Sequence, residues 1–156
     1  MAAAAKGVVA TVMASIDNLQ EVLARVKASI DAAEAEGSPA GGGAGQCWVH
    51  SGFLTAYDSV RPAVLGLVDT VLAGEEGEAW TVLLTGHSLG GALATLAAYD
   101  LSLRRWTRRP RVAMYNFGSP RVGNRVFAAE FNARVPDAWR VVNRSDAVCT
   151  VPRLMG

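Results

Sequence analysis

The sequence predicts an α/β fold, in which a parallel sheet alternates with helices and is preceded by an amphipathic N-terminal helix. From residue 80 onward, short apolar runs alternate with segments of helical spacing, an order typical of parallel strands joined by right-handed crossovers. A second observation is a serine between two glycines, Gly86-His87-Ser88-Leu89-Gly90, at one strand-to-helix junction. Since crossover helices cover a parallel sheet, we expect helices on both of its faces.

The composition excludes several classes of protein. A length of 156 residues suits one compact domain, and 51% hydrophobic residues are enough to bury a core. A net charge of +1 gives no electrostatic footprint for a nucleic-acid partner, so we expect none. Cys47 and Cys149 form neither a disulfide framework nor a metal-binding spacing, and we expect no metal and no cofactor.

The N-terminal residues contain no convincing targeting signal. Residues 1–14 loosely resemble a short signal peptide, but their apolar part is brief and passes straight into a helical pattern. No apolar run reaches the roughly 18 residues that a membrane span needs. The sequence does not identify the cellular compartment, and we take the cytoplasm as the default expectation.

A heptad stripe marks the first segment of the chain, which predicts an amphipathic helix within residues 1–37. A glycine-rich linker over 38–46 separates it from the remainder, residues 47–156. We favour a surface helix that lays one stripe on the domain over a self-associating coiled coil, because three heptads make a marginal coiled coil. The stripe consists of Val12, Ile16, Leu19, Leu23, Val26, Ile30 and Ala33.

The remaining elements follow from periodicity and from breakers. Apolar residues recur at helical spacing from Phe53 to Leu72, and Pro62 divides them into a short first piece and a main helix over 61–73. Strands are predicted over 80–85, 111–117 and 139–143, and helices over 89–103 and 124–134.

Ser88 is the candidate nucleophile of this chain. In a G-x-S-x-G turn between strand and helix, the serine oxygen is lifted above the edge of the sheet. We expect crowding on both sides of the turn to leave no room for a Cβ at either flanking glycine. The backbone N–H of Leu89, at the start of the next helix, is the candidate oxyanion donor.

A nucleophilic serine also needs a base and a carboxylate that orients it. Asp146 follows the last predicted strand, at the edge where the turn also opens, and is the candidate acid. The chain's two histidines, His50 and His87, both precede it, so neither has the base's place in the order serine, acid, histidine. We interpret His50 as a packing residue and expect the His87 side chain to leave the turn away from the serine oxygen.

Four blocks in order make the chain resemble the class 3 lipases of the α/β-hydrolase superfamily. They lie at 49–53, 86–94, 116–124 and 140–152, and the third reads Asn116-Phe117-Gly118-Ser119-Pro120-Arg121-Val122-Gly123-Asn124. The resemblance implies a partial α/β-hydrolase fold with a nucleophile elbow. The amino-acid sequence of the last two blocks most resembles that of plant and algal members of the family.

The resemblance implies a serine carboxylic-ester hydrolase that acts on acylglycerols or related lipids through an acyl-enzyme. Matched residue by residue, Ser88 takes the family's nucleophile position, Asp146 its acid position and Leu89 its oxyanion position. The early strand with its oxyanion loop, the lid and the late histidine have no match here. We therefore expect an incomplete copy of the family, with no strand before residue 47.

The partners follow from these interpretations. A lipid ester is the expected substrate, and a sheet with exposed edges predicts self-association. The basic run from Arg104 to Arg111, with Trp106, predicts contact with a lipid surface in one interpretation. We favour the other, a cationic helix end that complements the helix dipole. The alternative to an enzyme is a non-catalytic lipid-binding or interaction module that uses the heptad helix.

Overall fold

The structure is a computed structural model that describes residues 7–8, 45–73, 80–106 and 110–152. The predicted heptad helix and most of the glycine linker lie outside these residues, so the division at 37 and 46 stays a prediction. No helix in the described ranges combines the length and the apolar character that a membrane crossing needs.

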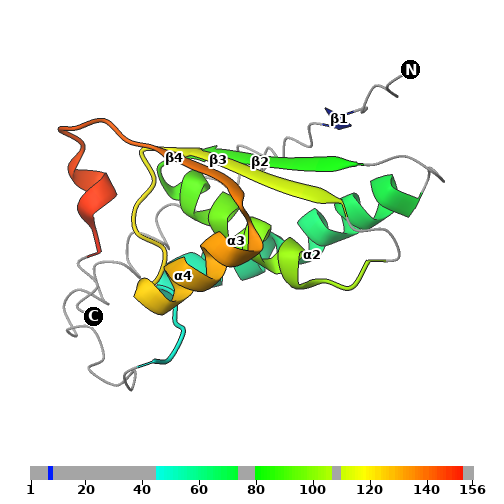
Figure 1. Cartoon of the computed structure of the whole chain (residues 1–156), viewed down its shortest axis with the longest axis horizontal. Coiled ribbons are helices and arrows are strands. Elements are labelled where there is room, and N and C mark those ends of the chain that lie inside the picture. The colour runs from blue at the N-terminus through cyan, green and yellow to red at the C-terminus, as the bar shows by residue number, and fades with distance from the viewer. Residues whose placement is uncertain (1–6, 9–44, 74–79, 107–109, 153–156) are drawn as a thin grey trace.

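A four-stranded parallel sheet forms one layer of the molecule (Figure 1). Its order is β1-β2-β3-β4, with β1 at Gly7–Val8, β2 at Thr81–His87, β3 at Arg111–Phe117 and β4 at Asp137–Val141. All three pairings are parallel. The α/β class predicted from alternating strands and helices is thus confirmed. β1 contradicts the expectation that no strand precedes residue 47.

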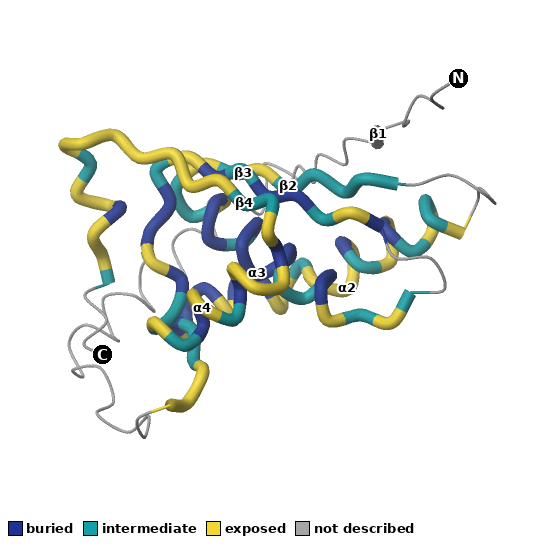
Figure 2. The backbone as a smooth tube through the Cα atoms, viewed as in Figure 1, coloured by how far each residue is buried: buried dark blue, intermediate teal, exposed yellow. Residues whose placement is uncertain are grey.

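The described helices all lie on one face of the sheet, as Figure 1 shows. They are α2 (Ser51–Ala73), α3 (Leu89–Leu103) and α4 (Arg125–Arg134). The expectation of helices on both faces is wrong for the described elements. The edge strand β4 is exposed at its carboxyl end (Figure 2), and its Trp139 is 60% exposed. The self-association expected from an exposed sheet stays a prediction.

α2 is one continuous helix of 23 residues that contains Pro62, so the predicted break is wrong. Proline removes the N–H that would bond the carbonyl four residues earlier, here that of Asp58. Both residues are exposed, so water can take the place of that hydrogen bond. Phe53, Tyr57 and Val64 meanwhile bury one face of the helix, which holds it together across the proline.

α3 is the central helix of the core and is built from small residues. Ala92 and Ala98 are fully buried, and Leu101 is 1% exposed. A Cβ at Gly91 would lie 2.8 Å from the Ser119 Cβ. Small side chains therefore let α3 lie close against the sheet at its N-terminal end.

A polar network joins α2 to α3. The Tyr57 hydroxyl donates to an Asp100 oxygen at 2.9 Å, and Arg61 donates to both Asp100 oxygens at 2.7 and 3.0 Å. Burial, followed by the hydrogen bond to Asp100, raises the pKa of Tyr57 far above its usual value. The network fixes α2 on the helix that follows Ser88.

α4 is anchored by its N-cap, Asn124. Its side chain accepts from the Phe127 N–H at 2.9 Å and donates to the Gln46 carbonyl at 2.7 Å. An antiparallel bridge between Val49 and Gly123 continues this contact. The cap thus ties the entry to α2 against the loop that leads into α4.

Most predicted bounds agree with the structure. The helix over 89–103 and the strand over 111–117 are confirmed residue for residue. β4 begins two residues before the predicted start at Trp139, because Asp137 already pairs with Ala113. Apolar patterning located this strand poorly, since Trp139, Arg140 and Val141 are exposed.

We predict that Leu101→Ala lowers the free energy of unfolding by about 2–5 kcal/mol, because it leaves a cavity at a fully packed site. Urea denaturation followed by circular dichroism measures the loss. Leu103→Ala is the matched control on the same helix: its side chain is 48% exposed, and we expect a change within about 0.5 kcal/mol. Equal losses in the two variants would contradict this view of the core.

Candidate active site

Ser88 lies at the turn between β2 and α3 in a strained backbone conformation. Its φ is 52° and its ψ is −123°, and it is the sole non-glycine residue of the described ranges with a positive φ. The Ser88 N–H donates to the Phe117 carbonyl at 2.9 Å, and the Ser88 carbonyl accepts from the Gly91 N–H at 2.9 Å. Neighbouring backbone thus holds the turn in the geometry of a nucleophile elbow.

The Ser88 hydroxyl is not used to cap α3, because its side chain makes no capping hydrogen bond. Leu89 is the first residue of α3, where a backbone N–H has no carbonyl of its own helix to bond. The half-buried Ser88 therefore lies directly before the Leu89 N–H, which has no hydrogen-bond partner within α3. That is the pair needed to attack a carbonyl and to hold the oxyanion that forms.

The glycines around Ser88 differ in their importance. A Cβ at Gly86 would overlap the Gly90 carbonyl, whereas a Cβ at Gly90 would meet nothing within 4 Å. The expectation that both flanking glycines are crowded is therefore half wrong. The second crowded position is Gly91, which packs against Ser119 and Asn116.

Asp146 caps a short 3-10 helix, η1 (Ala147–Thr150), beyond the end of β4. Its Oδ1 accepts from the Val148 N–H at 2.9 Å, and its Oδ2 accepts from the Cys149 thiol at 3.4 Å. Burial, followed by this contact, raises the pKa of the Cys149 thiol. The carboxylate is thus oriented by two donors of its own turn.

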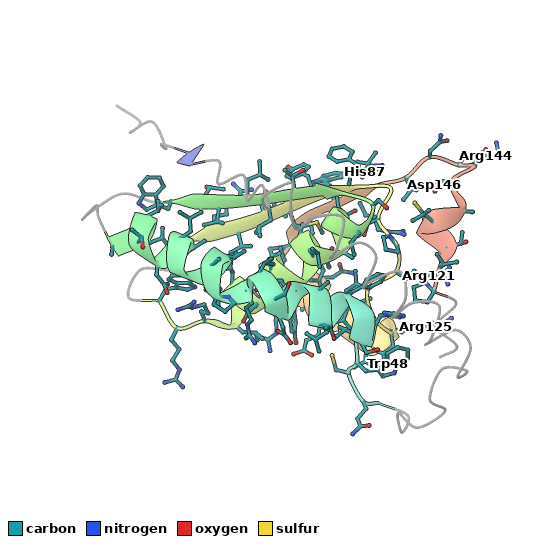
Figure 3. The ribbon with its side chains drawn as sticks, turned by 180° about the vertical axis from the view of Figure 1, so that it is seen from behind. Trp48, His87, Arg121, Arg125, Arg144 and Asp146 are labelled. Carbon is teal, nitrogen blue, oxygen red and sulfur yellow. The ribbon has the colours of Figure 1, made fainter. Side chains whose placement is uncertain are left out.

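Gly118 brings the carboxyl ends of three strands together. It follows β3 with a φ of 58°, and its N–H donates to the Val141 carbonyl of β4 at 2.9 Å. A Cβ there would lie 3.0 Å from Asp146 Oδ2 and 3.4 Å from His87 Nε2. The candidate acid and the last side chain of β2 thus lie against one glycine, and Figure 3 shows both at this edge.

Neither histidine is bonded to Ser88 or Asp146 among the hydrogen bonds of the described residues. His50 is 8% exposed and its Nδ1 accepts from the Gly52 N–H at 3.2 Å, while its ring lies 4.7 Å from that of Phe53. This supports the interpretation of His50 as a packing residue, here one that caps the start of α2. His87 is exposed at the end of β2.

The basic segment after α3 is used in part to end that helix. The Trp106 indole N–H donates to the Leu101 carbonyl at 3.1 Å, and the Arg104 guanidinium lies 5.1 Å from the Trp106 ring centre. Arg104 also pairs with Asp69 of α2 at 2.9 Å. These contacts support the helix-end interpretation, in which Trp106 is a cap and not a free anchor.

Within the described ranges, no group of three or more His, Cys, Asp or Glu side chains could hold a metal ion. A cavity of about 250 Å³ lies on the helical face of β3 and β4, against α4. Ser88 and Leu89 are not among its lining residues, which include Met114, Asn116 and Phe127.

A parallel sheet with a strained serine between β2 and α3 defines a serine hydrolase-like α/β fold. The family model Lipase (class 3) matches residues 7–155, and the chain belongs to this family. The match begins well before the first of the four sequence blocks at Val49. The family resemblance therefore extends into the N-terminal segment, beyond what the four blocks indicate.

The chain is similar to several known lipases. It is 36% identical over 147 residues to the chloroplastic phospholipase A(1) DAD1 of Arabidopsis thaliana, covering 92% of this chain and 32% of that one. The chain thus spans about a third of the length of this relative. The solved Rhizomucor miehei triacylglyceride lipase is 30% identical with a TM-score of 0.61, covering 81% of this chain and 48% of that one. A triacylglycerol lipase with a serine protease triad is 33% identical with a TM-score of 0.59, covering 80% and 48%.

We predict that Gly86→Ala lowers the free energy of unfolding by about 1–3 kcal/mol, because its Cβ has no room beneath the turn. Thermal and urea unfolding measure the change. Gly90→Ala has open space and lies in a helix, so we expect it to be neutral or to stabilise by about 0.5–1 kcal/mol. The elbow packing described above would be wrong if the two variants behaved alike.

Proposed function

We propose that the protein is a serine carboxylic-ester hydrolase that acts on acylglycerols or related lipids. The observation that carries the proposal is the positive φ of Ser88 between β2 and α3. Such strain persists at a turn only where surrounding structure fixes it, and it is typical of a nucleophile elbow. The names of the relatives, phospholipase and triacylglycerol lipase, support a lipid ester as the substrate.

In the proposed reaction, the Ser88 Oγ attacks the ester carbonyl carbon and its proton passes to an imidazole base. The Leu89 N–H donates to the oxyanion of the tetrahedral intermediate. The intermediate collapses as the leaving alcohol takes the proton from the base, which leaves an acyl group on Ser88. Water then attacks the acyl-enzyme, and the fatty acid is released.

Asp146 has the proposed role of orienting the base. Its carboxylate lies at the edge where β2, β3 and β4 end, with Oδ2 close to Gly118. One carboxylate held by two donors and facing the end of β2 can fix the tautomer of an imidazole. The His50 imidazole caps α2 and is not assigned the role of base. Imidazole added in solution can therefore supply the base in an experiment.

We also propose contact between this edge and a lipid surface. Beside Asp146 the exposed apolar side chains are Phe117, Val141, Val142, Val148 and Val151. Arg121 and Arg144 are exposed at the same end of the molecule (Figure 3). Apolar side chains with flanking cations are the composition of a peripheral lipid-binding surface.

We predict that a fluorophosphonate probe labels Ser88, and that added imidazole raises the labelling rate by roughly 10²-fold because it supplies the base. Intact-protein mass spectrometry measures the rate. Asp146→Asn should remove most of the gain from imidazole, since a neutral amide no longer orients or balances an imidazolium. Ser88→Ala is the control for the labelled residue. No labelling of the folded protein, even with imidazole, would refute the nucleophile assignment.

We predict that the protein floats with phosphatidylcholine vesicles that contain phosphatidylglycerol, and that Val142→Asp together with Val148→Asp weakens this binding. The reason is that a carboxylate does not enter the acyl region and repels anionic headgroups. Flotation on a density gradient gives the bound fraction. Leu103→Asp, at an exposed position on α3, is the control and should bind like the parent protein. A bound fraction insensitive to the two valines would count against this surface.

A further inference from the structure

The segment that carries Asp146 has almost no apolar packing to hold it. Within residues 142–152, Cys149 alone is buried, while Asp146 and Pro152 are half-buried and the others are exposed. η1 itself is a single turn of four residues. Side-chain burial therefore cannot fix where the carboxylate of Asp146 lies, and hydrogen bonds to the rest of the fold must do so.

Arg140 supplies one of these hydrogen bonds, and the same nitrogen makes a second hydrogen bond that anchors Arg140 to the loop after β3. Its Nη2 donates to the Ser119 carbonyl at 2.8 Å and to the Cys149 carbonyl at 2.8 Å. Ser119 belongs to the loop that follows β3, and Cys149 belongs to η1. Arg140 itself lies in β4, opposite Asn116 of β3. One side chain thus joins β4, the loop after β3 and the turn that carries Asp146.

This arginine is used differently from the others that form polar contacts in the described ranges. Arg61, Arg104, Arg111 and Arg134 each bind a carboxylate. Arg140 instead directs both hydrogens of one nitrogen at backbone carbonyls. Hydrogen bonds from a charged donor are stronger than neutral ones, and the planar guanidinium fixes their directions. The two carbonyls are therefore held at a defined separation.

The contact reaches Asp146 through η1. The Cys149 carbonyl is bound by Arg140, while the Cys149 thiol donates to Asp146 Oδ2. On the far side of η1, the Arg121 N–H donates to the Val151 carbonyl at 2.8 Å. The hydrogen bonds from Arg140 to Cys149 and from Arg121 to Val151 therefore join the η1 segment to β4 and to the loop after β3.

We propose that Arg140 is a positioning residue for Asp146: by clamping the Ser119 and Cys149 carbonyls, it holds the carboxylate at the edge shared by β2, β3 and β4. The inference rests on the proposed function, in which Asp146 orients the base. Arg140 itself contacts neither Ser88 nor the reacting ester, and acts only through η1. Without the clamp, η1 moves as a unit and Asp146 loses its place relative to Ser88.

The test compares Arg140→Met with Arg125→Met in the full chain. Arg125 is exposed at the start of α4, so its loss removes the same charge without the clamp (Figure 3). We expect Arg140→Met to slow imidazole-assisted labelling of Ser88 by roughly tenfold, the effect of losing a hydrogen bond from a charged donor. Arg125→Met should keep the parent rate, and Arg140→Lys should restore part of it.

The Asp146→Asn background separates positioning from general damage. If Arg140 acts through Asp146, Arg140→Met has no further effect on labelling once the carboxylate is gone. An equal slowing in both backgrounds, or an unchanged rate in the parent background, would overturn the proposal. Should Arg140→Met not fold, Arg140→Lys and Arg140→Gln are compared in the same two backgrounds.

Hydrogen exchange gives a readout that does not depend on activity. The Arg121 amide is expected to exchange roughly tenfold faster in Arg140→Met, because its acceptor at Val151 moves with η1. The Ser88 amide, which donates to Phe117, should be unchanged. If Ser88 is never labelled, the proposed function fails while this measurement still decides the clamp. Unchanged exchange at Arg121 would overturn it.

Discussion

The close approach of α3 to the sheet is the constraint on which the candidate site depends. Gly86 and Gly91 lie where any side chain would strike backbone or Ser119, so the helix can begin directly over the end of β2. The buried alanines of α3 continue this close contact along the helix. Ser88 is held with a positive φ between these two surfaces, and its strain is offset by the packing on both sides.

Much of the fold could be predicted because strong local patterns match the structure. α3 and β3 are delimited by apolar runs, glycines and Pro110, and their predicted bounds hold. β1 could not be predicted, since two residues carry no periodicity and the strand exists through pairing with Thr81 and Val82. The continuity of α2 across Pro62 depends on solvent at Asp58, which local rules on proline do not include.

The candidate site likewise contains residues that could be predicted from the sequence and residues that could not. Ser88 and Leu89 belong to a contiguous motif, and Asp146 follows a strand in the expected order, so the sequence alone could propose these three residues as candidates. Gly118 and Arg140 act through contacts with residues distant in the chain or through carbonyls that have no sequence signal. The crowding at Gly91 in place of Gly90 likewise depends on Ser119, some thirty positions later. Contacts between residues that are distant in the chain are therefore the part of the site that a single sequence does not predict.

The pairing of β1 with β2 has a consequence for the order of folding. β2, α3, β3, α4 and β4 follow one another directly, so each parallel pair closes a loop of one helix. Gly7 must instead find Thr81 across the whole of α2 and the segments beside it. Because closing a longer loop costs more chain entropy, the elbow unit can assemble first and β1 is expected to dock last. During synthesis β1 would thus wait for its partner β2 until α2 and the segments beside it have emerged.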